Sequence, residues 1–367
     1  MQWKTFIVAL LVERSVGQMP MLRFQCSQLV VDRLDPLVNP GMVPSPHLHQ
    51  IVGGNSFNAS MDPATHDLPS SSTCTSCTFS EDFSNYWTAV LYFRARNGTY
   101  RRVPQFVSEG LRADGGITVY YIPSPDANEK VTAFKPGFRM LVGNAASEGP
   151  NSQARKVCHR CMPATGDNSN VNCGAPDSQS LPTEFCPGGI RSVITFPTCW
   201  DGKNTDSPDH MSHVAYPTSS YTDVSVGAYG TCPASHPVKI PQVMYEVMWD
   251  TRIFNDKNIW PEDGSQPFKG TDSPLVKPRL HSLLFPVLSD SFSIVIDAVF
   301  QGFSQHGDYV FGWLGDSLQR AMDARCNGAV CGQLEMQSSE SAMRCIKSRT
   351  GTEEIDGWVD EIPGMAM

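Results

Sequence analysis

Twelve cysteines are the feature of this 367-residue chain that most restricts what it can fold into. An even number of cysteines in an exported chain is most simply a framework of disulfides, although the sequence does not reveal which residues pair. Two C-x-x-C pairs, Cys74/Cys77 and Cys158/Cys161, have the internal spacing of a zinc ribbon, but about eighty residues separate them. That separation is far beyond a ribbon's, so the disulfide interpretation is favoured over a zinc site.

The composition favours short strands over a helical bundle. The chain has 29 glycines and 28 prolines, and only 18% of its residues are charged, which suits many strands joined by turns. Its net charge of −9 argues against nucleic acid or an anionic membrane surface as the main partner. No segment beyond the N-terminus is apolar enough to predict a membrane span.

The first seventeen residues have the pattern of a signal peptide. Lys4 precedes an apolar run over residues 5–12, and Ser15 and Gly17 provide small residues for cleavage. A buried N-terminal strand is the alternative interpretation. With the cysteines, this pattern predicts a secreted protein, extracellular or in the cell wall. We expect one domain over residues 18–345 and a loosely held tail over residues 346–367.

Runs of aromatic and β-branched residues recur along the chain and predict β-strands. The predicted strands fall within residues 86–107, 116–123, 131–144, 189–200, 224–230, 242–251 and 291–300. Asn97-Gly98 predicts a hairpin turn, residues 315–326 form the clearest predicted helix, and residues 148–184 are interpreted as a long loop pinned by cysteines. The sequence therefore predicts a mainly β protein, an antiparallel β-sandwich or jelly-roll-like fold with few short helices.

Histidine and aspartate are concentrated in three short polar segments. The first is His47-x-His49, whose side chains point to the same side of an extended chain, roughly 6.5–7 Å apart. The second, residues 199–217, contains Asp201, Asp209, His210 and His213, and the third, residues 302–313, contains Gln305, His306 and Asp308. Five of the nine histidines of the chain thus lie in these segments.

Clusters of this kind support two chemistries. Neutral imidazoles with a carboxylate can bind a divalent metal ion, and histidine and aspartate can also act directly as general acid and base. The candidate catalytic residues are His47, His49, Asp201, Asp209, His210, His213, His306 and Asp308. The candidate metal ligands are His47, His49, His213 and His306. The candidate substrate-binding residues are Lys203, Asn204, Gln305, Tyr216, Tyr309 and Trp313.

Each of these residues also has a structural interpretation. A loop histidine is more often hydrogen-bonded than a ligand, and a tryptophan such as Trp200 or Trp313 is more often part of the core. Lys203, Asn204 and Asp206 are consistent with a simple turn. Whether the three segments converge on one pocket is not visible from their spacing. The sequence lacks the G-x-S-x-G, H-E-x-x-H and nucleotide-binding glycine motifs, which disfavours those enzyme classes.

Six blocks of the sequence resemble successive blocks of one secreted fungal and bacterial family, the domain of unknown function DUF1996. They are RLDPLVNPGMVPSPHLHQIVGGNSF, SNYWTAVLYF, GFRMLVGN, ITFPTCWDGKNTDSPDHMSHVAYP, CPASHPVKIPQVMYEVMWDT and GFSQHGDYVFGWLGDSLQRAMDARC. The resemblance covers roughly residues 24–326. It implies one large domain whose motifs include H-x-H, D-H-x-x-H and H-G-D. Pro46 stands before His47 where many relatives have serine, which stiffens the approach but leaves the imidazole available.

We therefore expect a secreted carbohydrate-active enzyme that cleaves a polysaccharide, as a hydrolase or a lyase, with a polysaccharide or cell-wall glycan as partner. A divalent metal ion is the one cofactor that the residues suggest. A non-catalytic glycan- or wall-binding protein is the first alternative, motivated by the WSC modules joined to some fungal relatives. A secreted metal-scavenging or redox protein is the second.

Overall fold

The computed structural model describes residues 20–107, 111, 115–147, 149–150, 156–165, 173–218, 230–271 and 302–365. The predicted signal peptide and the predicted strand at 291–300 lie outside these residues, as does all but the last residue of the predicted strand at 224–230.

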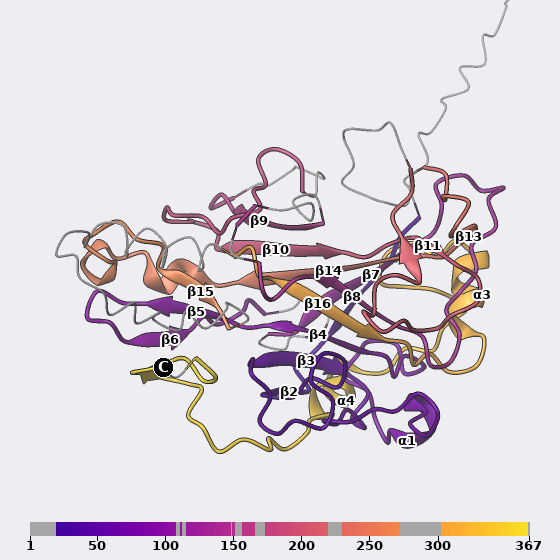
Figure 1. Cartoon of the computed structure of the whole chain (residues 1–367), viewed down its shortest axis with the longest axis horizontal. Coiled ribbons are helices and arrows are strands. Elements are labelled where there is room, and N and C mark those ends of the chain that lie inside the picture. Colours follow the sequence, from indigo (N-terminus) through magenta and orange to yellow (C-terminus); the bar gives the residue numbers. More distant parts are fainter. Residues whose placement is uncertain are drawn as a thin grey trace, which may run out of the picture.

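Two five-stranded antiparallel sheets form the body of the protein. The first has the order β1 (Leu22–Cys26), β7 (Ile117–Ile122), β14 (Gln242–Trp249), β10 (Ile190–Thr195) and β9 (Val157–Cys161). The second has the order β2 (Val30–Asp32), β3 (His49–Gly53), β4 (Asn85–Ala89), β16 (His306–Val310) and β8 (Arg139–Gly143). In Figure 1, β9 and β10 lie in the upper part of the molecule and β2 and β3 in the lower part. This layered, mainly β architecture confirms the predicted antiparallel β-sandwich.

Facing side chains bind the two sheets together. Because neighbouring residues of a strand point to opposite faces, Gly307 and Tyr309 of β16 face the first sheet while His306 and Asp308 face away. A Cβ at Gly307 would lie 2.9 Å from the Ile194 side chain, so the sheets meet closely here. The Tyr245 hydroxyl donates to the carbonyl oxygen of Asp308 at 2.6 Å, which fixes β14 against β16.

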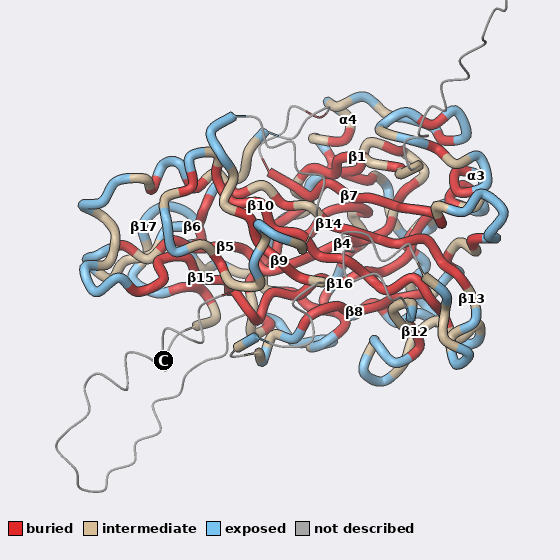
Figure 2. Tube along the Cα trace, turned by 90° about the horizontal axis from the view of Figure 1, so that it is seen from above, coloured by how far each residue is buried: buried red, intermediate tan, exposed pale blue. Residues whose placement is uncertain are grey.

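The outer face of the second sheet is covered by the chain around its N-terminal strands. Ile51, Trp87 and Val310 point to this face, and apolar residues from positions 29–37 and 57–68 pack against them. Figure 2 shows buried residues running along the central strands and exposed residues mainly in the loops. A strand buried on both faces explains why segments such as β7, ITVYYI, lack the alternation of a half-exposed strand.

Smaller elements extend the sandwich. A four-stranded sheet has the order β15 (Phe268–Gly270), β5 (Leu91–Arg94), β6 (Tyr100–Arg102) and β17 (Trp358–Val359), and a three-stranded sheet has the order β12 (Val214–Ala215), β11 (Cys199–Trp200) and β13 (Val238–Lys239). Among the described residues, the helices are α1 (Leu68–Ser71), α3 (Ser317–Asp323) and α4 (Ser339–Arg344), with 3-10 turns at Thr251–Phe254 and Lys257–Ile259. The Asn97-Gly98 turn joins β5 to β6 as predicted, and α3 lies within the predicted helix.

All twelve cysteines lie in the described part of the chain and form six disulfides, which confirms the predicted framework. The pairs are Cys26–Cys77, Cys74–Cys345, Cys158–Cys173, Cys161–Cys186, Cys199–Cys232 and Cys326–Cys331. The two C-x-x-C pairs are therefore not a zinc site, because each of their cysteines is bridged to a different partner. Within the described ranges, no helix has the length and apolarity needed to cross a membrane.

Candidate active site

The first and third polar segments meet on the outer face of the second sheet. His49 begins β3 and pairs with Ala89 of β4, and β4 in turn pairs with β16, which begins at His306. The two histidines therefore stand two strands apart, about 9–10 Å between backbones, with only the methyl group of Ala89 between them. A small residue at this position leaves room for the two imidazoles to lean together.

The imidazoles of His49 and His306 are in direct contact. Their Nε2 atoms lie 3.2 Å apart, and both side chains are buried. Nδ1 of His49 lies 3.0 Å from the carbonyl oxygen of Leu34. Since a carbonyl oxygen only accepts, His49 carries a proton on Nδ1 and, when neutral, presents the lone pair of Nε2 to His306.

Asp308 completes this buried cluster. It follows His306 by two residues and so points to the same face, where its Oδ2 lies 3.3 Å from Nε2 of His306. Its side chain has no exposed surface. Trp87, opposite Asp308 in the register of β4 and β16, packs beside it as part of the apolar cover. The carboxylate thus acts on His306 from a setting of low dielectric, where charge interactions are strong.

His47 lies at the open side of the cluster. Its ring centroid is 6.1 Å from that of His49 and 6.2 Å from that of His306, and the residue is half-buried. A pocket of about 490 Å³ opens there, and we call it the histidine pocket. It is lined by Asp35, Val38, His47, Leu141, Gly143, Asn144, Ala145, Ala146, Ser147, Met211 and His306. Its volume lies in the range of ligand-binding clefts.

Backbone geometry keeps His306 at the floor of the pocket. Gly143 of β8 pairs with His306 and has a φ of +97°. A Cβ at Gly143 would lie 2.7 Å from the Cα of His306 and 2.4 Å from the carbonyl oxygen of Gln305. Glycine is therefore required both by the left-handed conformation and by the close approach of the two strands. Gln305 is buried and donates from Nε2 to Thr88, so it positions β16 and does not line the pocket.

The second polar segment reaches the same pocket at its edge. Met211 lines it, and the backbone N–H of Leu141 donates to the carbonyl oxygen of His210 at 3.0 Å. Nδ1 of His210 lies 2.7 Å from the Asp206 carboxylate, and this hydrogen bond raises the pKa of His210 above its usual value. His210 is thus a neighbour of the pocket whose side chain is bound to Asp206.

Three other candidates of this segment stabilise its turns. Asp201 accepts from the backbone N–H groups of Lys203 and Asn204, which is the turn that the sequence left open as an alternative. Asp209 accepts from the backbone of Ser212 and also of Met211, and these hydrogen bonds lower its pKa. His213 is buried, with Nδ1 2.8 Å from the Ser207 hydroxyl.

The expected sugar-stacking aromatics lie away from the pocket. Tyr309 and Trp313 are buried in the core between the sheets, where the Tyr121 hydroxyl bonds to both. The Tyr216 hydroxyl donates to the carbonyl oxygen of Thr195. Tyr309 alternates with Asp308 on β16, so these two side chains point to opposite faces. None of these three aromatic residues, nor Lys203 or Asn204, lines the histidine pocket.

Sequence reasoning did not single out Asp35, Asn144 and Ser147, which bring polar groups to the pocket. Asp35 is buried and accepts from the backbone N–H groups of Leu37 and Val38. A local sequence pattern could not have identified these three residues. Each lies in a loop after a strand, and the pocket residues that it meets are distant in the sequence. The one sign was that Asp35 lies in the RLDPLVNPG stretch, within the same sequence block as His47 and His49.

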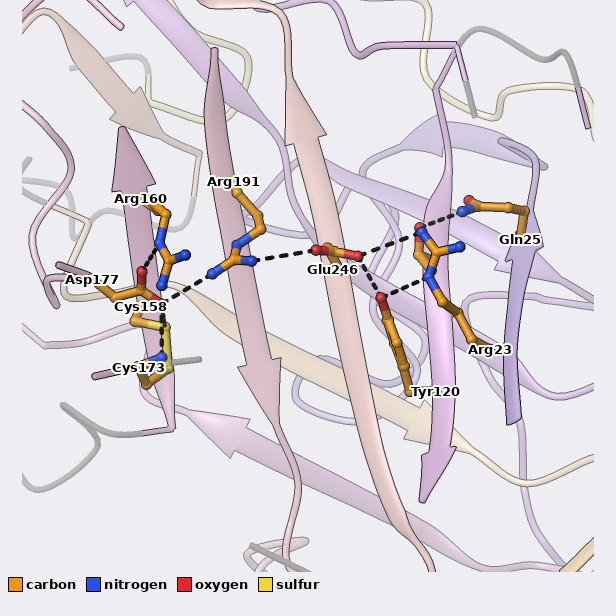
Figure 3. Close-up of polar contacts among 10 residues, drawn as sticks. Arg23, Gln25, Tyr120, Cys158, Arg160, Cys173, Asp177, Arg191 and Glu246 are labelled. Atoms are coloured by element: carbon orange, nitrogen blue, oxygen red, sulfur yellow. Dashed lines mark hydrogen bonds and ion pairs between the residues drawn. A yellow bond between two sulfur atoms is a disulfide. The ribbon is translucent and has the colours of Figure 1, made fainter. Parts of the chain in front are cut away.

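A second polar cluster crosses the outer face of the first sheet, with side chains from β9, β10, β14, β7 and β1 (Figure 3). Asp177 pairs with Arg160 and Arg191, and Arg191 reaches Glu246 at 3.8 Å. The Tyr120 hydroxyl donates to Glu246 at 2.6 Å. Acidic and basic groups alternate across the strands, so the buried charges compensate one another.

A third set of converging groups is Cys26, Cys77 and Asp82, whose potential ligand atoms lie within 4.8 Å of one another. The two cysteines form a disulfide with each other, so they have no thiolate to offer a metal ion. Asp82 instead accepts a hydrogen bond of 2.6 Å from the Tyr86 hydroxyl. Burial raises the pKa of Asp82 to about 7, although hydrogen bonds from Tyr86 and Ser84 oppose the shift.

The family model described as domain of unknown function, DUF1996, matches residues 35–313. The chain belongs to this family. The matched span begins at Asp35, ends at Trp313 and contains every residue that lines the histidine pocket. No curated protein and no solved structure is similar enough to the chain to count as a match. The description of the DUF1996 family assigns it no activity.

Proposed function

We propose that the histidine pocket is the active site of an extracellular enzyme that cleaves a polysaccharide. The observation that carries the proposal is the convergence of His47 and His306 on one pocket, with His49 and Asp308 directly behind them. Residues that only stabilised the fold would not need to bring three imidazoles and a buried carboxylate together beside an opening. Clusters of titratable groups in a cleft are characteristic of catalytic sites.

The chemistry of glycan cleavage suits these groups. Breaking a glycosidic bond requires a proton donor for the leaving oxygen and a second group that acts as base or nucleophile. His47, half-buried at the opening, is placed to exchange protons with substrate and solvent. His306 at the floor is the partner, oriented by Asp308 in the way a carboxylate orients a catalytic imidazole.

The lining of the pocket favours hydrolysis of a neutral sugar over elimination. A lyase acting on a uronic acid needs a positive group to neutralise the carboxylate next to the proton that is removed. Among the described residues that line the pocket there is no lysine or arginine. Asn144 and Ser147 provide amide and hydroxyl groups, which suit hydrogen bonding to sugar hydroxyls.

The disulfides support an extracellular location. Six bridges join segments along most of the described chain, from Cys26 to Cys345, and such frameworks persist in oxidising compartments. We therefore propose that the protein is secreted and acts outside the cell or in the cell wall.

Screening purified protein on fungal and plant wall glycans tests the proposal, with released reducing ends as the readout. We expect His47→Ala and His306→Ala to lower the rate at least about a hundredfold, the scale of a lost general acid or base. His66→Ala is the matched control, because His66 lies outside the pocket lining and should leave the rate unchanged. Equal rates for the parent, His47→Ala and His306→Ala would reject the active site.

A non-catalytic glycan-binding role is the second candidate, and one observation favours it. Trp358 of β17 is 47% exposed, and the Arg101 guanidinium lies 5.9 Å from its ring centroid. An exposed indole beside a cation is a surface on which sugar rings can stack. Under this hypothesis, Trp358→Ala abolishes binding to insoluble glycan, no product is released, and alanine at His47 and His306 has no effect.

A further inference from the structure

We propose that Asp35 selects the substrate of the histidine pocket by charge, so that the pocket takes a glycan without acidic groups and excludes one that carries carboxylate or sulfate groups. The inference rests on the proposed function, because it names the substrate class of the same pocket and the residue that distinguishes it. Asp35 lines the pocket together with His47 and His306, the two histidines proposed to act on the substrate.

The carboxylate of Asp35 is held in place by its own turn. Its Oδ1 accepts from the backbone N–H groups of Leu37 and Val38 at 3.1 and 3.0 Å. Its backbone carbonyl oxygen accepts from the N–H group of Asn39 at 3.2 Å. Oδ1 is thus committed to the turn, whereas Oδ2 accepts no hydrogen bond from the described residues and is the oxygen left for a ligand.

A role in the turn alone does not explain where Asp35 lies. Asp201 and Asp209 stabilise turns through the same kind of hydrogen bond, but neither lines the pocket, and Asp209 is exposed. Asp35 is only 1% exposed. Burying a carboxylate away from water costs free energy unless a partner compensates it. The hydroxyl groups of a bound sugar are suitable partners for the remaining oxygen of Asp35.

No fixed positive charge compensates Asp35 within the part of the chain that the structure describes. None of its residues forms an ion pair with Asp35, and the pocket lining has no lysine or arginine. Arg33, two residues earlier, pairs with Glu353 instead. The other ionisable residues of the lining are His47 and His306, which exchange protons in the proposed reaction and so carry no permanent charge.

An acidic sugar would meet the Asp35 carboxylate as a like charge. Like charges brought together at a binding site oppose binding strongly, most of all where the surroundings exclude water. The net charge of −9 on the whole chain also repels a polyanion. A neutral sugar instead donates its hydroxyl groups to the carboxylate, and hydrogen bonds to an ionised acceptor are stronger than those between neutral groups.

Asn144 supplies a complementary donor in the same pocket. Its Oδ1 accepts from the backbone N–H group of Ala146 at 2.9 Å, so the amide Nδ2 is the part that can donate to a ligand. Asn144 follows β8 and Asp35 follows β2, and these are the two edge strands of the second sheet. The pocket therefore combines an acceptor from one edge with a donor from the other, which suits a ring that carries several hydroxyl groups.

The test compares one glycan with and without added charge. The parent and Asp35→Asn are assayed on the neutral glycan that the parent cleaves fastest and on a partially carboxymethylated preparation of the same glycan. We expect the parent to cleave the carboxymethylated form at least about tenfold more slowly, and Asp35→Asn to narrow this difference severalfold. Asp67→Asn is the matched control: it changes the net charge equally, lies outside the pocket lining and should keep the parent's ratio of rates.

Asp35→Asn separates charge from folding, because the asparagine oxygen can still accept from the N–H groups of Leu37 and Val38, and thermal unfolding checks this. The same ratio of rates in the parent and Asp35→Asn would show exclusion by size, overturning the inference and leaving the proposed function standing. If the parent cleaves neither glycan, the proposed function fails, and calorimetric titration with the two soluble glycans tests the inference alone. Tighter binding of the neutral glycan, with the preference lost in Asp35→Asn, supports the inference, whereas equal binding or no binding of the two glycans overturns it.

Discussion

At the scale of single residues, Ala89 decides whether the two buried histidines can meet. It pairs with His49 on the central strand β4, has no exposed surface, and stands between the strands that carry His49 and His306. A larger side chain here would fill the space over which the imidazoles lean together. The cluster therefore depends on a residue that carries no chemistry of its own.

We predict that Ala89→Val separates the Nε2 atoms of His49 and His306 and lowers the rate of glycan cleavage at least about tenfold. Overpacking should also lower the free energy of unfolding by about 1–3 kcal/mol. Urea unfolding and the release of reducing ends measure the two effects. Ala89→Gly is the control: it loses stability through the strand backbone but keeps the space, so its rate of cleavage should match the parent's.

The raised pKa of Asp82 predicts that the stability of the folded protein depends on pH. Its pKa is raised to about 7 in the folded protein, chiefly by burial, and is about 3.9 in an unfolded chain. Between these values the unfolded chain has released the proton that the folded protein still binds. Stability contributed by Asp82 therefore falls as the pH rises from about 4 to about 7, by up to roughly 4 kcal/mol, and is constant above that range.

Asp82→Asn should remove this dependence, because an amide stays neutral and can still accept from the Tyr86 hydroxyl. We expect the variant to be more stable than the parent at pH 8, with a smaller difference at pH 4.5. Asp360→Asn, at an exposed position, should leave the pH profile of the parent unchanged. A parent-like pH profile for Asp82→Asn in urea titrations would show that Asp82 does not carry the effect.

At the scale of elements, the pairing of β8 with β16 determines how close the pocket floor lies to its wall. Gly143 allows β8 to approach the backbone of Gln305 and His306 more closely than any side chain would permit. The alternation of β16 then directs His306 and Asp308 outward and Tyr309 inward. Asp308 and Tyr309 are neighbours on β16, yet Asp308 supports the histidine pocket and Tyr309 packs in the core.

We predict that Gly143→Ala displaces His306 and lowers the rate of glycan cleavage at least about tenfold, in addition to lowering stability. Gly98→Ala is the matched control: Gly98 also has a positive φ, of +89°, but nothing lies within 4 Å of its would-be Cβ. It should lose only the backbone contribution, about 1 kcal/mol. Cleavage by Gly143→Ala at the parent's rate would show that the close approach does not position His306.

Local patterns predicted much of the secondary structure but only part of the site. Short-range propensity and turn residues determine the β-rich runs, the Asn97-Gly98 hairpin and the α3 helix. Both can be recognised directly in a sequence. The contact between His49 and His306 depends on the order β3-β4-β16, which joins residues 257 positions apart. Asp201 and Asp209 look like catalytic carboxylates by composition, and only their turn hydrogen bonds show their structural role.

At the scale of the whole molecule, the C-terminal segment returns to the strands beside the pocket. The Asp32 carboxylate accepts from the backbone of Thr350 and Gly351, and Tyr92 donates to the carbonyl oxygen of Ile355. Further along, Gly364 lies against the carbonyl of Pro46, the residue before His47. The Cys74–Cys345 disulfide links the start of the segment to the N-terminal half of the chain.

Limited proteolysis distinguishes this attachment from the loosely held tail that the sequence suggested. If the contacts hold the segment, the parent resists cleavage within residues 346–365 and Asp32→Ala is cut there at least several-fold faster, because a buried carboxylate that anchors two backbone N–H groups is lost. Glu361→Ala, an exposed change in the same segment, should be cut at the parent's rate. Rapid cleavage of the parent would support the loose tail.

A crystal structure of the protein with a bound oligosaccharide would show whether the distant histidines form one working site. We predict a sugar ring in the histidine pocket, within hydrogen-bond reach of His47 and facing His306. A sugar bound against Trp358, with only solvent in the histidine pocket, would contradict it.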